Sequence, residues 1–212
     1  MEAADARLVG FVLLSIVIGV VVEAIGSGRG KFTSAFWRLP LDDKLDHIAQ
    51  HRNEWWLMGS TWVAILGVLT AGMVGLAWLL AASGQGTLAW VSLGAYLIGV
   101  GAWLWGIFVQ TPVTWTAASQ RRETGSTPGW LQPFWLAAFM AELSFLILTN
   151  LAYAGMGVAI IASSFPAVWA GWVAVGLGVL IPVGVVISRA GFPHLALMAP
   201  IVFAVALLIE GF

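Results

Sequence analysis

The sequence predicts an all-α protein, a polytopic integral membrane protein built as a bundle of six transmembrane helices, with a cytoplasmic amphipathic helix before the second. Three observations predict this class. Hydrophobic residues make up 60% of the 212 residues and charged residues only 9%, whereas soluble domains carry about 25% charged residues. The apolar residues gather in long stretches, and the basic residues fall in alternate gaps between those stretches.

The apolar stretches are long enough to cross a bilayer, because a spanning helix needs about 20 predominantly apolar residues. They lack the alternating pattern of a membrane barrel, and backbone groups in hydrocarbon must find partners within a helix. We expect one transmembrane domain over residues 1–212. The six stretches are Leu8–Ile25, Trp55–Ala82, Leu88–Gln110, Phe134–Ala162, Ala167–Ile187 and Pro193–Ile209.

The basic residues predict the orientation of this bundle. Of the nine Lys and Arg residues, all except Arg7 follow the first, third or fifth stretch. Cytoplasmic loops of membrane proteins carry an excess of Lys and Arg. The rule places loops 26–54, 111–130 and 188–192 in the cytoplasm and both termini on the extracytoplasmic side. An even number of helices independently requires both termini to lie on one side.

Composition also weighs against several functions. The chain has no Cys and a net charge of -1, so it offers no thiolate chemistry and gives no reason to expect nucleic acid as a partner. A retinal protein needs a Lys within a span, but Lys31 and Lys44 both lie in a loop. No Gly-rich phosphate loop is followed by Lys-Ser or Lys-Thr, which argues against ATP hydrolysis.

The segment Leu41–Trp56 predicts an amphipathic helix that leads into the second span. At 100° per residue, one face collects Asp43, His47, His51 and Glu54. Two His residues four apart can share a metal ion, and a carboxylate one turn away can be a further ligand. The His-Glu-x-x-His motif of zinc peptidases is absent, and the other interpretation is a polar face that contacts water or lipid headgroups.

His194 extends this metal hypothesis, because it begins the sixth stretch and the predicted topology puts it on the cytoplasmic side. Three His and a carboxylate would complete a zinc site, or leave one position open for a catalytic water. His47, His51 and His194, with Asp43 or Glu54 as ligand or base, therefore define an alternative function: a membrane-embedded hydrolase that uses zinc or another divalent metal.

A polar stripe on the fourth stretch is the second candidate site. Glu142, Thr149, Asn150 and Tyr153 lie within about 100° of arc on an otherwise apolar helix. Glu142 lies about 12 Å in from Phe134 at 1.5 Å per residue, near the middle of a hydrocarbon core of roughly 30 Å. Ionisable residues within spans usually face the bundle interior and mark function, although a protonated Glu can also join helices structurally.

Two further polar residues belong to the predicted polar interior. Glu23 lies in the last turns of the first stretch, and Gln110 ends the third. Gln110 shares a helix face with Tyr96 and Trp103. That face can line a pocket or pack as an ordinary helix contact with aromatic filling, and the sequence leaves both interpretations open.

The last two stretches carry a pattern of Gly and Pro residues, namely Gly171-Trp172, Gly176, Gly178, Pro182, Pro193 and Pro200. This pattern, over about a quarter of the chain, resembles small bacterial membrane proteins of families of unknown function that are common in actinobacteria. The resemblance implies a helical bundle in a bacterial inner membrane.

The polar stripe favours a non-enzymatic role. We expect a binding or accessory subunit, or a small transporter component, with a polar interior around Glu142. The lipid bilayer is the expected partner, together with other membrane subunits or a second copy of the chain.

Overall fold

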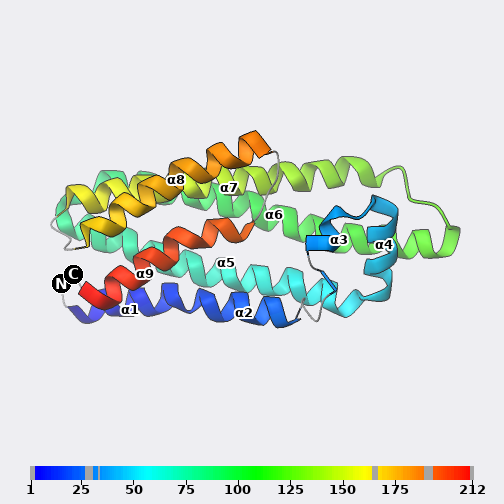
Figure 1. Ribbon diagram of the computed structural model, residues 1–212, viewed down its shortest axis with the longest axis horizontal. Coiled ribbons are helices and arrows are strands. Elements are labelled where there is room, and N and C mark those ends of the chain that lie inside the picture. Colours follow the sequence, from blue (N-terminus) through cyan, green and yellow to red (C-terminus); the bar gives the residue numbers. More distant parts are fainter. Residues whose placement is uncertain (1–2, 27–30, 33, 164–166, 189–192, 211–212) are drawn as a thin grey trace. The chain divides into compact units, whose positions relative to one another are not determined.

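The computed structural model describes residues 3–26, 31–32, 34–163, 167–188 and 193–210. These residues are almost entirely helical, with no strand among them, so the prediction of an all-α protein is confirmed (Figure 1). The elements are α1 (Ala3–Leu14), α2 (Ile16–Gly26), α3 (Ser34–Arg38), α4 (Leu41–Gln50), α5 (Arg52–Leu80), a π-helical turn (Ala81–Gln85), α6 (Gly86–Thr124), α7 (Leu131–Ala162), α8 (Val168–Ser188), a 3₁₀ helix (Pro193–Leu197) and α9 (Met198–Glu210).

Within this part of the chain, five continuous helical segments are long and apolar enough to cross a membrane. The longest, Arg52–Thr124, contains both α5 and α6. These two helices are joined at Gly84, whose φ of 90° favours glycine because a side chain would be strained there. Each of the six predicted apolar stretches therefore lies almost entirely in helix. The other four segments are Ala4–Glu23, Leu131–Ala162, Val168–Ile187 and Pro193–Glu210.

The predicted loop 111–130 is wrong in its first part, because α6 continues through it as far as Thr124. Pro112 lies inside the helix. Gly125 ends the helix in the left-handed conformation, with a φ of 73°, and its N–H donates to the Arg121 carbonyl at 2.7 Å. Hydropathy marks where a helix stops being apolar, so it could not show that this helix continues with polar residues.

The predicted amphipathic helix is present as α4, but it does not run unbroken to Trp56. Backbone angles of φ -125° and ψ 47° at His51 separate α4 from α5. Leu45, Ile48 and Trp55 are nevertheless all buried in one cluster. A break of one residue leaves this pattern of apolar positions unchanged, so periodicity could not reveal it.

The chain forms two compact units. Unit 1 comprises Met1–Val17, Leu66–Trp103 and Glu142–Phe212, and unit 2 comprises Ile18–Ile65 and Leu104–Ala141. Helices α5, α6 and α7 contribute residues to both units.

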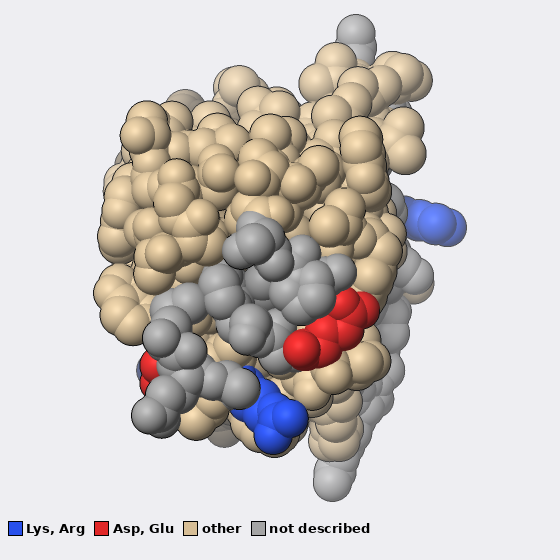
Figure 2. All heavy atoms as spheres, turned by 90° about the vertical axis from the view of Figure 1, so that its left-hand side faces the viewer, with Lys and Arg blue, Asp and Glu red and all other residues tan. Residues whose placement is uncertain are grey.

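In unit 1, α9 packs along α1 and also contacts α8, and α1 begins at the end of the unit where α9 ends (Figure 1). Seen from that end, the unit presents mainly uncharged side chains, with a few acidic and basic ones (Figure 2). Small residues bring α7 close to two neighbours. A Cβ atom on Gly99 of α6 would lie 3.0 Å from Thr149, and one on Gly171 of α8 would lie 2.7 Å from the Gly157 carbonyl oxygen.

In unit 2, the short helices α3 and α4 pack through an aromatic and aliphatic cluster. This cluster explains why the segment before α5 is folded, since it supplies a core of its own. Its buried members are Phe32, Phe36, Leu45, Ile48, Trp55, Ala117, Ala118 and Leu131.

Candidate functional site

A group of polar side chains is buried inside unit 1, and we call Thr70, Tyr96, Asn150 and Tyr153 the hydroxyl–amide cluster. Thr70 lies on α5, Tyr96 on α6 and the other two on α7. Tyr96, Asn150 and Tyr153 are each 0% exposed. The two Tyr rings have centroids 6.0 Å apart, and Asn150 lies one helical turn before Tyr153, on the same face of α7. Three helices thus bring polar groups together in an apolar interior.

Hydrogen bonds account for part of this cluster. The Thr70 hydroxyl donates to the Leu66 carbonyl at 2.7 Å, and its oxygen lies 3.3 Å from the Tyr96 hydroxyl. A Thr hydroxyl has a single proton, so Tyr96 is the donor to Thr70. The Asn150 Nδ2 donates to the Leu146 carbonyl at 2.8 Å.

Two atoms of the cluster remain without a partner. The Asn150 Oδ1 and the Tyr153 hydroxyl are buried and make no hydrogen bond with any residue that the structure describes. Buried polar groups are nearly always hydrogen-bonded in proteins, and an unsatisfied one costs about 1–3 kcal/mol. The cluster therefore presents an unused acceptor and an unused donor one helical turn apart.

Thr149 belongs to the predicted stripe but not to the cluster. It is 0% exposed, and its hydroxyl donates to the Phe145 carbonyl at 2.6 Å. A Ser or Thr hydroxyl that bonds back within its own helix in this way is satisfied locally. Thr149 instead lies at the close approach of α7 to Gly99, so its role in unit 1 is packing.

Glu142 lies two helical turns before the cluster on α7 and is partly buried. His194, in the 3₁₀ helix before α9, lies near enough to interact electrostatically with the Glu142 carboxyl. Both residues belong to unit 1. The structure thus places within electrostatic range of each other two residues that the sequence had assigned to different sites.

The other two residues of the predicted polar interior lie in unit 2, whereas the cluster lies in unit 1. Glu23 is buried near the end of α2, with 9% of its surface exposed. Gln110 is partly buried on α6.

The residues proposed as metal ligands have other contacts. His47 on α4 lies against the rings of Phe32 and Phe36, with centroids 5.2 Å and 5.4 Å apart, and its Nε2 is buried without a partner among the described residues. The His51 ring lies 4.7 Å from the His47 ring. Glu54 forms an ion pair with Lys31 at 2.5 Å.

Charge and burial act on two of the groups around α4. Burial lowers the pKa of His51 below its usual value, and the nearby Lys31 and His47 lower it further, against the opposing effect of Glu54. His51 is therefore neutral near pH 7. Burial also lowers the pKa of Lys44.

The structure gives no support to a three-ligand metal centre. No group of three or more His, Asp or Glu that could hold a metal ion occurs among the residues described. Asp43 is exposed on α4, and His194 belongs to unit 1 whereas His47 and His51 belong to unit 2. Residues 189–192, which precede His194, lie outside the described part.

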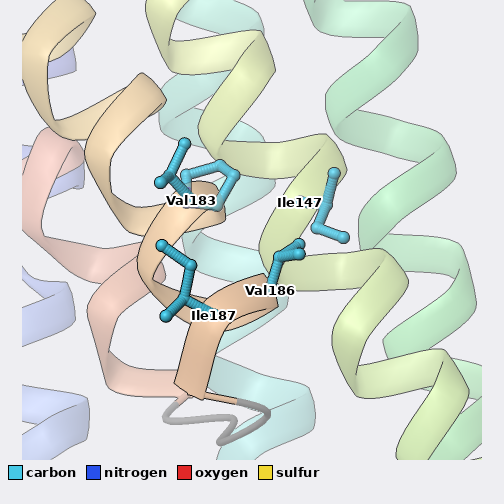
Figure 3. Close-up of a pocket in the computed structure, with 5 residues that line it drawn as sticks. Ile147, Val183, Val186 and Ile187 are labelled. Atoms are coloured by element: carbon cyan, nitrogen blue, oxygen red, sulfur yellow. The ribbon is translucent and has the colours of Figure 1, made fainter.

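A shallow hollow of 250 Å³ between α7 and α8 is entirely apolar (Figure 3). Its side chains offer no group that could orient a polar ligand or take part in chemistry. Val183 and Ile187 in its wall are also among the exposed apolar residues. The hollow is lined by Ile147, Pro182, Val183, Val186 and Ile187.

Sequence analysis missed Thr70 and the contacts of Arg121. Thr70 has apolar neighbours along α5, and its link to the cluster depends on the position of Tyr96 on α6. The Arg121 guanidinium binds Asp46 at 2.8 Å and Asp42 at 3.2 Å. Charges 75 residues apart carry no local pattern that could have predicted this pairing.

Comparison with family models finds no match for the chain, and neither do comparisons with curated proteins and with solved structures. The resemblance of the last two stretches to actinobacterial membrane proteins stays an expectation.

Proposed function

We propose that this chain is an integral membrane protein that binds a small polar ligand inside its helical bundle, as a small transporter component or a ligand-binding accessory subunit. The observation that carries the proposal is the pair of unpartnered polar atoms in the hydroxyl–amide cluster, the Asn150 Oδ1 and the Tyr153 hydroxyl. A site that leaves buried polar groups unpaired loses stability unless a ligand or water pairs with them.

Exposed apolar side chains support the membrane location. Ile98 on α6 is 67% exposed, Leu180 on α8 is 69% exposed and Ile187 on α8 is 77% exposed. Soluble proteins rarely carry contiguous apolar surface of this kind, whereas lipid solvates it. We propose a bacterial inner membrane and six spans, in which α5 and α6 each cross once.

The basic residues support the orientation. Cytoplasmic positions for residues 26–54, 111–130 and 188–192 would place every Lys and Arg except Arg7 on the inner side. Both termini then lie outside. The end of unit 1 seen in Figure 2 carries few charged side chains, which accords with an extracytoplasmic face poor in basic residues.

The chemistry of the cluster favours an uncharged ligand that both donates and accepts hydrogen bonds. The Asn150 Oδ1 needs a donor, and the Tyr153 hydroxyl needs an acceptor. No member of the cluster is ionised at neutral pH, so nothing there neutralises a charged ligand. Hydroxyl and amide groups meet both requirements.

The proposal is tested by comparing Tyr153→Phe with Tyr96→Phe in detergent-solubilised protein. Tyr96→Phe removes a hydroxyl that is bonded to Thr70 and should lower the free energy of unfolding by about 1 kcal/mol. Tyr153→Phe removes only an unpartnered hydroxyl, so the free energy of unfolding should stay equal or rise. Equal losses in both variants would show that the Tyr153 hydroxyl is structural and would contradict the proposal.

Ligand binding is measured by thermal unfolding of the wild type and of Tyr153→Phe with a panel of uncharged solutes that carry hydroxyl or amide groups. A solute that binds the folded state raises the unfolding temperature. We expect at least one solute to stabilise the wild type and not the variant. If every solute acts equally on both proteins, the cluster is not a binding site.

A further inference from the structure

The acidic residues around α4 and the start of α5 are largely paired with basic ones. Arg121 binds both Asp42 and Asp46, and Lys31 binds Glu54. The Thr127 hydroxyl also donates to Asp42. These pairs bring two basic residues against three of the carboxylates in this region.

Two basic residues of the same region have no acidic partner among the described residues. The Lys44 ammonium lies over the ring of Trp135, 5.5 Å from its centroid, and the Arg52 guanidinium lies over the ring of Trp115 at 4.8 Å. An indole face attracts a cation and holds it in place, but it supplies no counter-charge. The indole ring of a neighbouring helix thus holds each cation in place, and the positive charge remains available to an anion.

Unit 2, which contains these cations, also carries exposed apolar side chains. Trp37 on α3, Trp56 and Leu57 on α5 and Phe134 on α7 are exposed in the same unit. Trp beside Lys or Arg at the ends of apolar helices is typical of the level of lipid headgroups. A free phosphate ion would use the cations alone, whereas a phospholipid would use the cations and the apolar side chains together.

We infer that the Lys44–Trp135 and Arg52–Trp115 pairs bind the phosphate groups of anionic phospholipids. The ligand is a lipid of the leaflet on the side of α4, with its phosphate on the cation and its acyl chains along the exposed apolar side chains. The inference rests on the proposed membrane location and is separate from the hydroxyl–amide cluster.

The experiment is a titration of detergent-purified protein with phosphatidylglycerol or with phosphatidylcholine of the same acyl chains, followed by thermal unfolding. Phosphatidylglycerol should raise the unfolding temperature of the wild type more than phosphatidylcholine does. The double variant Lys44→Gln/Arg52→Gln should raise the apparent dissociation constant for phosphatidylglycerol about 30-fold, since each basic residue near an anionic headgroup contributes a factor of about five to the affinity. Arg122→Gln removes an exposed cation of α6 that has no indole beside it and should keep the wild-type affinity.

Several outcomes would overturn the inference: wild-type affinity in the double variant, equal stabilisation by the two lipids, or the same stabilisation by inorganic phosphate at equal concentration. If the double variant does not fold, the salt dependence of the wild type tests the inference instead. An electrostatic preference for phosphatidylglycerol over phosphatidylcholine should disappear in 1 M salt, and a preference that persists would contradict the inference. Alkaline carbonate extraction separates the two proposals. Release from membranes refutes the location, whereas a protein retained there without a lipid preference refutes only this inference.

Discussion

Tyr96 and Tyr153 are both fully buried in unit 1, yet only one of their hydroxyls has a partner. Phe at position 153 would fill the same volume without an unpaired hydroxyl, so the tyrosine costs stability that packing alone does not require. The same reasoning applies to the Asn150 Oδ1. At the scale of single residues, the evidence for a binding site is therefore energetic: these groups are costly unless something binds them.

Glu142 allows a test of transport at the same scale. If a proton moves with the ligand, Glu142→Gln should slow proton flux on the order of a hundredfold, because a positioned acid or base contributes 10²- to 10⁴-fold to a proton transfer. The measurement uses liposomes that contain the protein and a trapped pH-sensitive dye. Glu210→Gln, which changes an exposed carboxylate at the end of α9, should leave the flux unchanged. Equal flux in the wild type and in Glu142→Gln would contradict a role for Glu142.

At the scale of elements, backbone contacts rather than long side chains fix α8 against α7. A Cβ atom on Gly178 would lie 2.4 Å from the Asn150 carbonyl oxygen and 2.8 Å from the Ala154 nitrogen. Backbone atoms cannot move aside as the end of a flexible side chain can. The close approach therefore requires glycine at position 178. The contact is made with the backbone of Asn150, a residue of the hydroxyl–amide cluster.

Gly178→Ala should accordingly lower the free energy of unfolding by about 1–3 kcal/mol, the usual cost of overpacking. Gly176→Ala is the matched control in the same helix, because a Cβ atom there meets nothing within 4 Å. It should leave stability equal or raise it slightly, since alanine favours helix. Denaturant unfolding of both variants measures the difference. Equal effects would show that α7 and α8 are not packed this closely.

The sequence predicted the long helices well, because a 20-residue apolar stretch permits only helix in either a bundle core or a bilayer. It predicted that the four members of the polar stripe face the interior: Thr149, Asn150 and Tyr153 are 0% exposed, whereas Glu142 is only partly buried. It could not predict which polar atoms find partners, because the bond between Tyr96 and Thr70 depends on how α5 and α6 pack. It also missed the break at His51, which leaves the apolar pattern intact.

At the scale of the whole molecule, orientation decides which residues face which compartment. The chain contains no Cys, so a single introduced Cys reports its own accessibility without background. Ala82, in the π-helical turn after α5, and Ser126, after α6, are both exposed. The proposed topology puts the first outside and the second in the cytoplasm.

A membrane-impermeant maleimide should therefore label Ala82→Cys in intact cells and Ser126→Cys only after lysis. The readout is the mass shift of the labelled protein on a gel. Labelling of Ser126→Cys alone in intact cells would show the opposite orientation. Labelling of both variants would contradict a crossing by α6.

The ion pairs of Arg121 also have a consequence for how the chain is made. Asp46 leaves the ribosome 75 residues before the arginine that binds it, a delay of roughly 4–15 s at typical rates of synthesis. During that interval the carboxylates of α4 are solvated only by water and ions. The helix acquires its charged partner only after α6 has been translated, so docking of α4 on α6 is a late step of biogenesis.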